Sequence, residues 1–154
     1  MTDVPVWLDE DQEQVWRALL QLTTRLPAVL NRQLTADSGL SLPDMDVLVA
    51  LGDLSEDRAR VSGLARTLGW ERSRLSHQVA RMERSGLVCR LPCEDDGRGA
   101  YVGLTDAGRR VLVVAAPTHV AFVRTLFVDA LDGAELRDLG TLVEALLDRI
   151  ATVP

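Results

Sequence analysis

One short stretch of the chain concentrates hydrogen-bond donors of the kind that bind phosphate groups and nucleotide bases. Its polar side chains are Arg72, Ser73, Arg74, Ser76, His77, Arg81 and Arg84. A guanidinium group pairs with a phosphate or with the O6/N7 edge of guanine, and small residues let a backbone approach base edges closely. The chemistry predicted for this stretch is therefore recognition of a polyanion through hydrogen bonds and charge.

A helix must position these side chains, because the apolar residues among them keep helical spacing. Leu75, Val79 and Met82 fall at i, i+4 and i+7, so they form one stripe that is expected to be buried. A shorter helix precedes this one and is expected to end at Gly69. The opposite side of the second helix then belongs to Ser73, His77, Ala80 and Arg84, flanked by Arg74 and Arg81. An ordinary solvated surface, in which neighbouring glutamates balance the arginines, is the alternative interpretation.

After residue 86 the pattern changes from helical spacing to that of strands. Residues 87–93 and 100–105 are expected to pair as a β-hairpin around a glycine-rich tip, in which Arg98 lies between two glycines. Asp96 is a candidate to orient the Arg98 guanidinium by accepting its hydrogen bonds, although a run of acids is also typical of a solvated turn. Two helices followed by a hairpin predict a winged helix-turn-helix.

Five segments in this order resemble the MarR family of bacterial transcriptional regulators. They are Leu64–Ala65, Arg72–His77, Arg81–Val88, Asp96–Arg98 and Leu104–Gly108. The resemblance implies a homodimer whose recognition helices enter successive major grooves of a near-palindromic double-stranded DNA operator, while the wing arginines enter flanking minor grooves. It assigns DNA binding to the polar residues of the second helix and to Arg98. The acidic run 94–96 makes this wing less basic than those of many relatives.

The flanking segments are predicted to be helical and to support the DNA-reading part. Residues 9–36 form a long first helix that Pro27 should kink, and Ser41–Asp44 has the form of a capping box. The helix after that box carries its inner residues at Val47, Leu48 and Leu51. Residues 59–61 are expected to add a short strand to the wing sheet.

The C-terminal part is predicted to hold two further helices. Thr105 caps the first, which Pro117 should interrupt, and Asp132–Glu135 caps the second. The last helix carries more apolar surface than one stripe needs. Such a surface is either intrachain core or a subunit interface, and the apolar arm 4–8 favours the interface.

The resulting prediction is a mainly α chain with a small β-hairpin wing. Residues 1–154 form a single MarR-like domain, in which 41–104 read DNA and 1–36 and 105–154 are helical dimerisation parts. No stretch approaches the roughly 20 apolar residues of a membrane span, and the start lacks a signal pattern, so we expect a cytoplasmic protein without a membrane partner.

Charge is unevenly distributed along the sequence. The net charge is −6, but residues 58–98 hold nine Arg against five acids, an excess of +4, whereas the rest of the chain carries −10. We expect binding to depend on dimerisation and base contacts, and to weaken with salt.

Control by a small molecule is implied by the resemblance, because MarR-like proteins commonly bind an aromatic compound between the dimer helices and the DNA-reading part. Trp16, Pro27, Met45 and His119 are candidate lining residues by helical position, and ordinary packing is the alternative for each.

Other functions have weaker support in the sequence. Cys89 and Cys93 raise a redox-sensor alternative, but four residues along a strand separate them by about 13 Å, too far for a disulfide unless Pro92 turns the chain. Two Cys and two distant His make no zinc signature, and the serines beside His77 lie on a convex helix without an enclosing pocket. We therefore predict no metal, cofactor or catalysis. A winged helix that binds protein instead of DNA also remains open.

Overall fold

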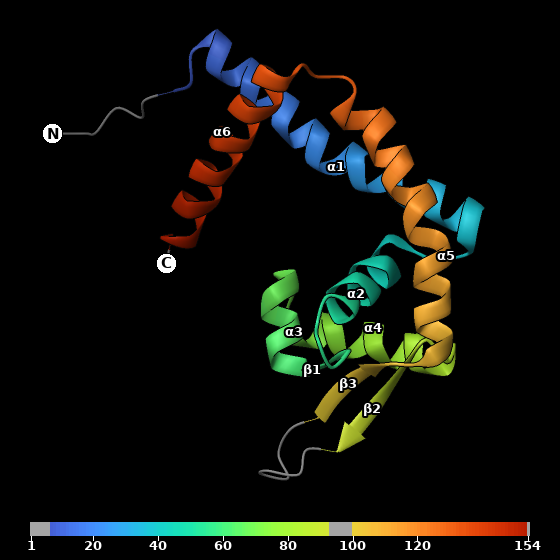
Figure 1. Cartoon of the computed structure of the whole chain (residues 1–154). Coiled ribbons are helices and arrows are strands. Elements are labelled where there is room, and N and C mark those ends of the chain that lie inside the picture. Colours follow the sequence, from blue (N-terminus) through green and yellow to red (C-terminus); the bar gives the residue numbers. More distant parts are fainter. Residues whose placement is uncertain (1–6, 93–99, 154) are drawn as a thin grey trace, which may run out of the picture. The chain divides into compact units, whose positions relative to one another are not determined.

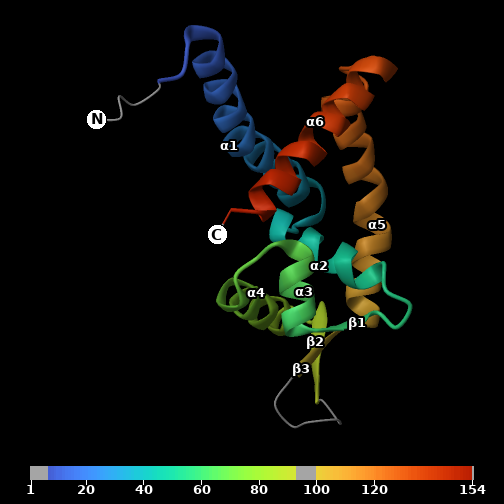
Figure 2. The same cartoon turned by 90° about the vertical axis from the view of Figure 1, so that its left-hand side faces the viewer.

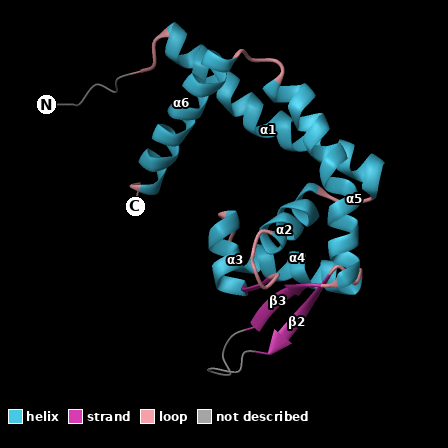
Figure 3. Cartoon of the chain, viewed as in Figure 1, coloured by secondary structure: helices cyan, strands magenta, loops and turns pink. Residues whose placement is uncertain are grey.

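The computed structural model describes residues 7–92 and 100–153, which form helices and a small sheet (Figures 1 and 3). The elements in chain order are α1 (Glu10–Ser38), α2 (Leu42–Gly52), β1 (Arg58–Arg60), α3 (Val61–Leu68), α4 (Arg72–Arg84), β2 (Val88–Pro92), β3 (Ala100–Leu104), α5 (Asp106–Val123), a π-helical turn (Arg124–Val128) and α6 (Gly133–Ala151). The chain divides into two compact units, and the boundary along the sequence lies between Ala115 and Ala116. The mainly α fold with a wing is the predicted one.

The sheet is antiparallel, with β3 between β1 and β2. Val88 pairs with Leu104 and Pro92 with Ala100, which confirms the predicted hairpin, and Arg60 of β1 pairs with Tyr101. The expected third strand lies one residue earlier than predicted, because Val61 already begins α3. Figure 2 shows the hairpin projecting away from α2, α3 and α4.

Leucine, valine and methionine side chains from α1 to β3 form the core of the first unit. The predicted inner residues of α2 and the predicted stripe of α4 all belong to it, with exposures of 0–1%. The large members of this core are Leu34, Leu40, Met45, Val47, Leu48, Leu51, Leu64, Leu75, Val79, Met82, Val88 and Val102. Full burial of such a side chain contributes about 1.5–3 kcal/mol. This core fixes how α4 lies against α2 and α3.

Helix starts follow the predicted capping residues. Ser41 and Asp132 each form a capping box with the residue three positions later, and so does Asp9 before α1. The hydroxyl of Thr105 accepts a hydrogen bond from the backbone N–H of Gly108 at 3.0 Å. Each side chain satisfies backbone donors that the first helical turn leaves without partners.

The start of α5 packs tightly against the first unit. A Cβ atom at Gly108 would lie 2.1 Å from the carbonyl oxygen of Leu87, so only glycine allows this approach. The next residue, Arg109, forms an ion pair with Asp57. Asp57 has a left-handed backbone (φ 50°), and its carbonyl accepts the N–H of Leu104 at 2.8 Å. These contacts join α5 to the base of the wing.

Helices α1 and α5 both continue through a proline, Pro27 and Pro117 respectively. The expected interruption at Pro117 is wrong, because α5 runs through it to Val123 and the irregular turn follows at Arg124–Val128. Proline removes one backbone donor but has a φ compatible with a helix, so a helix can continue through it. Helix α1 likewise continues through Pro27 and ends at Ser38, beyond the predicted residue 36.

Large apolar side chains remain exposed on each long helix. On α1, Val15 and Leu22 are 69% and 49% exposed, and on α6, Leu142 and Ile150 are 63% and 66% exposed. The segment Asp106–Val128 has the length and composition of a membrane span, although little of it is buried within the chain. The expectation that no stretch approaches this length is therefore wrong, because the many Val, Leu, Ala and Phe residues after Arg110 outweigh Thr118, His119 and Arg124 in mean hydropathy.

Candidate nucleic-acid interface

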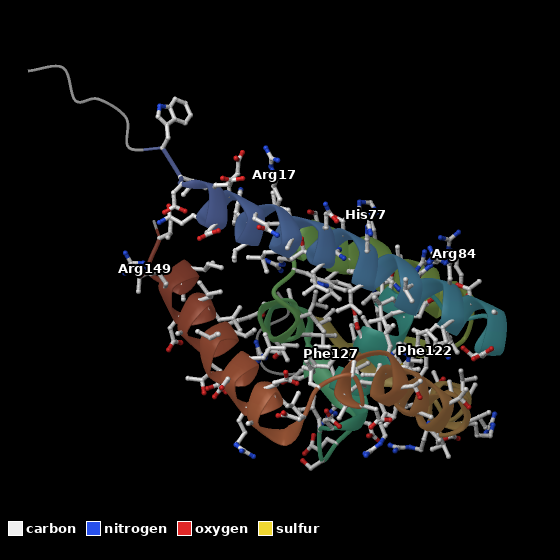
Figure 4. The ribbon with its side chains drawn as sticks, turned by 90° about the horizontal axis from the view of Figure 1, so that it is seen from above. Arg17, His77, Arg84, Phe122, Phe127 and Arg149 are labelled. Carbon is white, nitrogen blue, oxygen red and sulfur yellow. The ribbon has the colours of Figure 1, made fainter. Side chains whose placement is uncertain are left out.

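The side of α4 opposite its buried stripe is exposed and basic. Arg72, Ser73, Arg74, His77 and Arg84 are all exposed, and together they are called the reading face below. Figure 4 shows His77 and Arg84 pointing to the same side of the first unit. The structure thus exposes all five predicted residues along α4, and Arg74, His77, Arg81 and Arg84 line one hollow of its surface.

The first turn of α4 breaks the local rules of helix stability. Its N-cap residue, Glu71, makes no side-chain capping bond, and the turn holds no acid but carries Arg72 and Arg74. Cations are unfavourable beside the positive end of a helix dipole, and uncapped N–H groups are left for another partner. A bound anion such as a phosphate satisfies both. Local rules are commonly broken in this way at functional sites.

Another predicted arginine of α4, Arg81, has partners within the chain. Its guanidinium donates to Ser41 Oγ at 2.9 Å, to Asp44 Oδ1 at 3.2 Å and to Gln78 Oε1 at 2.8 Å. Gln78 is 9% exposed and donates from Nε2 to Asp44 Oδ1 at 2.6 Å. Asp44 is also the residue that completes the capping box of α2. These four residues, called the α2–α4 network, hold α4 against the start of α2.

Removing the shared acceptor of this network is expected to destabilise the fold. Asp44→Ala leaves the buried Gln78 Nε2 without its acceptor and removes one of the three acceptors of Arg81, at a cost of about 1–3 kcal/mol. Urea unfolding followed by circular dichroism measures it. Asp44→Asn is the matched control, because it keeps an acceptor oxygen and removes only the charge. Equal midpoints for Asp44→Ala and the wild type would contradict this role of the network.

Ser76 is the one predicted residue of α4 not yet described, and it is directed away from the reading face. It is half-buried, and its hydroxyl donates to the carbonyl of Arg72 at 2.9 Å. The carbonyl of Ser76 accepts from Arg90 Nη2 at 3.4 Å, and the Arg90 guanidinium also pairs with Glu83 at 3.7 Å. Ser76 therefore helps to attach strand β2 to α4.

The base of the wing carries a basic pair that sequence reasoning missed. The guanidinium carbons of Arg58 and Arg60 each lie 5.5 Å from the centre of the Tyr101 ring. Arg60 Nε also donates to the Tyr101 hydroxyl at 3.3 Å. The signal was available, because two arginines two residues apart on a strand share one face. The predicted Asp96, Arg98 and Cys93 lie outside the described residues.

The remaining candidates are dispersed. Trp16 lines a hollow of about 610 Å³ on the α1 surface beside Trp7, whereas Met45 is a 3% exposed core residue. Met45 therefore packs in the core of the first unit. Pro27 is exposed, and His119 lies in the second unit and is half-buried.

Cys89 is a free thiol on β2, 3.7 Å from the carbonyl oxygen of Gly103. Within residues 7–92 and 100–153, no three His, Cys, Asp or Glu side chains come together in a way that could hold a metal ion.

Comparisons with known proteins agree with this geometry. Residues 38–99 match a model of the MarR family. AbsC, a MarR family transcriptional regulator from Streptomyces coelicolor, is 35% identical and has a TM-score of 0.91 over 97% of this chain and 100% of its own.

Two further solved structures are similar. Sco3205, a MarR family transcriptional regulator from the same organism in complex with DNA, is 37% identical with a TM-score of 0.90 over 96% of this chain and 92% of its own. A probable transcriptional regulator from Pseudomonas aeruginosa is 26% identical, with a TM-score of 0.76 over 86% of this chain and 96% of its own. No curated protein sequence matches significantly. Because such identity extends over nearly the whole chain, this protein belongs to the MarR family of transcriptional regulators.

Proposed function

We propose that this protein is a homodimeric, sequence-specific repressor that binds a near-palindromic operator in double-stranded DNA in the cytoplasm. The observation that carries the proposal is the reading face, with exposed arginines opposite a fully buried stripe on the second helix of a helix-turn-helix. The similar structure of Sco3205 in complex with DNA supports the same partner for this chain.

The first turn of α4 is the part that enters the major groove in this proposal. Recognition helices contact base edges with their N-terminal residues, which here are Arg72, Ser73 and Arg74, with His77 one turn later. Arg84, near the other end, binds a phosphate. Arg81 keeps its proposed contact with DNA beside its role in the α2–α4 network, because the network bonds all use Nη2 and the side chain is 51% exposed. Arg98 and Asp96 of the wing keep their proposed minor-groove roles.

A second copy of the chain is the proposed cover for the exposed apolar helix surfaces. Several large apolar side chains exposed along one helix are unusual on a monomer in water. A membrane is the other environment that would cover Asp106–Val128. However, the regulator solved with DNA has a counterpart for nearly the whole chain, which supports an aqueous dimer. A dimer also places two reading faces on one palindrome, as the symmetry of the operator requires.

Release by a small aromatic compound is the last part of the proposal. The hollow on α1 supports it, because Trp7 and Trp16 offer aromatic contacts to a planar ligand. Its other lining residues are Leu8, Leu20 and the charged Glu13 and Arg17.

Selection of bound sequences from random duplex DNA tests the proposal directly. We expect an enriched near-palindrome, bound by two chains per duplex in sedimentation, with affinity that falls steeply as salt rises. Adding phenolic compounds to the same mobility-shift assay tests release. A protein that stays monomeric, or that binds no duplex at low salt, would contradict the proposal and favour a winged helix for protein partners.

A further inference from the structure

We propose that Trp70 is a positioning residue that holds the Arg74 guanidinium ready to read a base. This inference rests on the proposed DNA-binding function and concerns a residue that the sequence analysis did not single out. The Arg74 guanidinium carbon lies 4.2 Å from the centre of the Trp70 ring, within the range of a cation–π contact.

The Trp70 ring is itself held in place by the first unit. Gly69 ends α3 in the left-handed conformation (φ 63°), and the next N–H, that of Trp70, donates to the carbonyl of Ala65 at 2.9 Å. The ring is half-buried and packs against the hydrophobic core. Because the turn and the core fix this ring, a side chain stacked on it is fixed as well.

Stacking leaves the hydrogen-bonding capacity of Arg74 intact. The five N–H donors of a guanidinium lie in its plane, whereas a ring face contacts the group from above that plane. Arg81 is the contrast, because its guanidinium donates to Ser41, Asp44 and Gln78. Arg74 is therefore ordered by a contact that needs none of its donors, so a bidentate pair with guanine remains open to it.

The stack also offsets an electrostatic conflict. Arg74 is the third residue of α4, where the helix dipole disfavours a cation, and no acid lies in that turn. The negative face of the indole ring supplies part of the missing stabilisation. Ordering the side chain before DNA arrives lowers the entropy lost on binding.

A double-mutant cycle on the full-length protein tests the inference, with the operator taken from the selection above. Trp70→Leu keeps an apolar side chain but removes the ring face, and Trp70→Phe keeps a smaller ring. We expect Trp70→Leu to weaken operator binding about 5- to 30-fold in a dimer with two stacks, and Trp70→Phe to weaken it less. In the Arg74→Ala background, Trp70→Leu should change operator affinity less than twofold.

Two readouts separate positioning from a general loss of structure. Binding to random duplex DNA should stay within about twofold of the wild type, and urea unfolding reports whether Trp70→Leu is folded. If the variant does not fold, the Trp70→Phe arm of the cycle decides. An effect that persists in the Arg74→Ala background, or that is equal on operator and random DNA, overturns the inference alone. Absence of any operator binding by the wild type overturns the proposed function and this role with it.

Discussion

Arg74→Ala is expected to weaken operator binding by at least about 30-fold and to relax the preference for one base in each half-site. A bidentate arginine–guanine pair contributes about 1–3 kcal/mol of discrimination, and a symmetric dimer loses two of them. Fluorescence anisotropy with the operator and with single-base variants measures both effects. Arg84→Ala should behave differently, lowering affinity for all sequences alike and reducing the salt slope by about 2 per dimer, since each lost phosphate contact accounts for about 0.9.

Arg25→Ala is the matched control for these two variants. Arg25 is an exposed arginine on α1, so its loss changes the net charge equally without touching the reading face, and sedimentation checks that the variant still dimerises. We expect its operator affinity and salt slope to match those of the wild type. If Arg74→Ala and Arg84→Ala also bind like the wild type, the reading face is not the surface that contacts DNA.

Gly108→Ala is expected to destabilise the protein by about 3–5 kcal/mol, although it adds only one methyl group. The added Cβ would lie 2.1 Å from the carbonyl oxygen of Leu87, and a backbone atom cannot move aside as a flexible side chain can. Overpacking usually costs about 1–3 kcal/mol, and a clash with backbone lies above that range. At this chain length the change corresponds to a fall in Tm of about 6–20 °C.

Gly63→Ala is the control for this prediction. Gly63 also lies in a helix, α3, but nothing approaches its Cβ position within 4 Å. Alanine there should stabilise the protein by up to about 1 kcal/mol, because alanine is the better helix former. Differential scanning calorimetry compares the two variants. Equal Tm values for Gly108→Ala and the wild type would show that α5 does not pack against Leu87 as described.

Local sequence signals predicted the elements of the first unit well. Ser41–Asp44 predicted a capping box and the stripe Leu75–Val79–Met82 a buried helix face, and both are confirmed. These signals work because a cap or a stripe depends on residues within two turns of one another. The exposed side of α4 follows from the same periodicity, so most of the reading face was predictable as well.

Contacts between elements were not predictable in the same way. The α2–α4 network was not predicted, because the partners of Arg81 lie 37 and 40 residues earlier, at the start of α2. The stack of Arg74 on Trp70 was missed because it depends on how the turn at Gly69 aims a side chain. The prediction at Pro117 was wrong because the φ angle of proline fits a helix. The loss of one backbone hydrogen bond did not interrupt α5. Family membership also sets aside the catalytic alternative, since MarR members are transcriptional regulators and not enzymes.

Ion pairs inside the first unit have a consequence for how the protein finds its site. Arg58, Arg81 and Arg90 are already paired with Glu56, Asp44 and Glu83. Such paired cations add little long-range attraction toward a duplex, and the acidic remainder of the chain opposes it. If the protein binds DNA as proposed, we expect short residence on arbitrary duplex sequence and a search by dissociation and recapture rather than by long sliding.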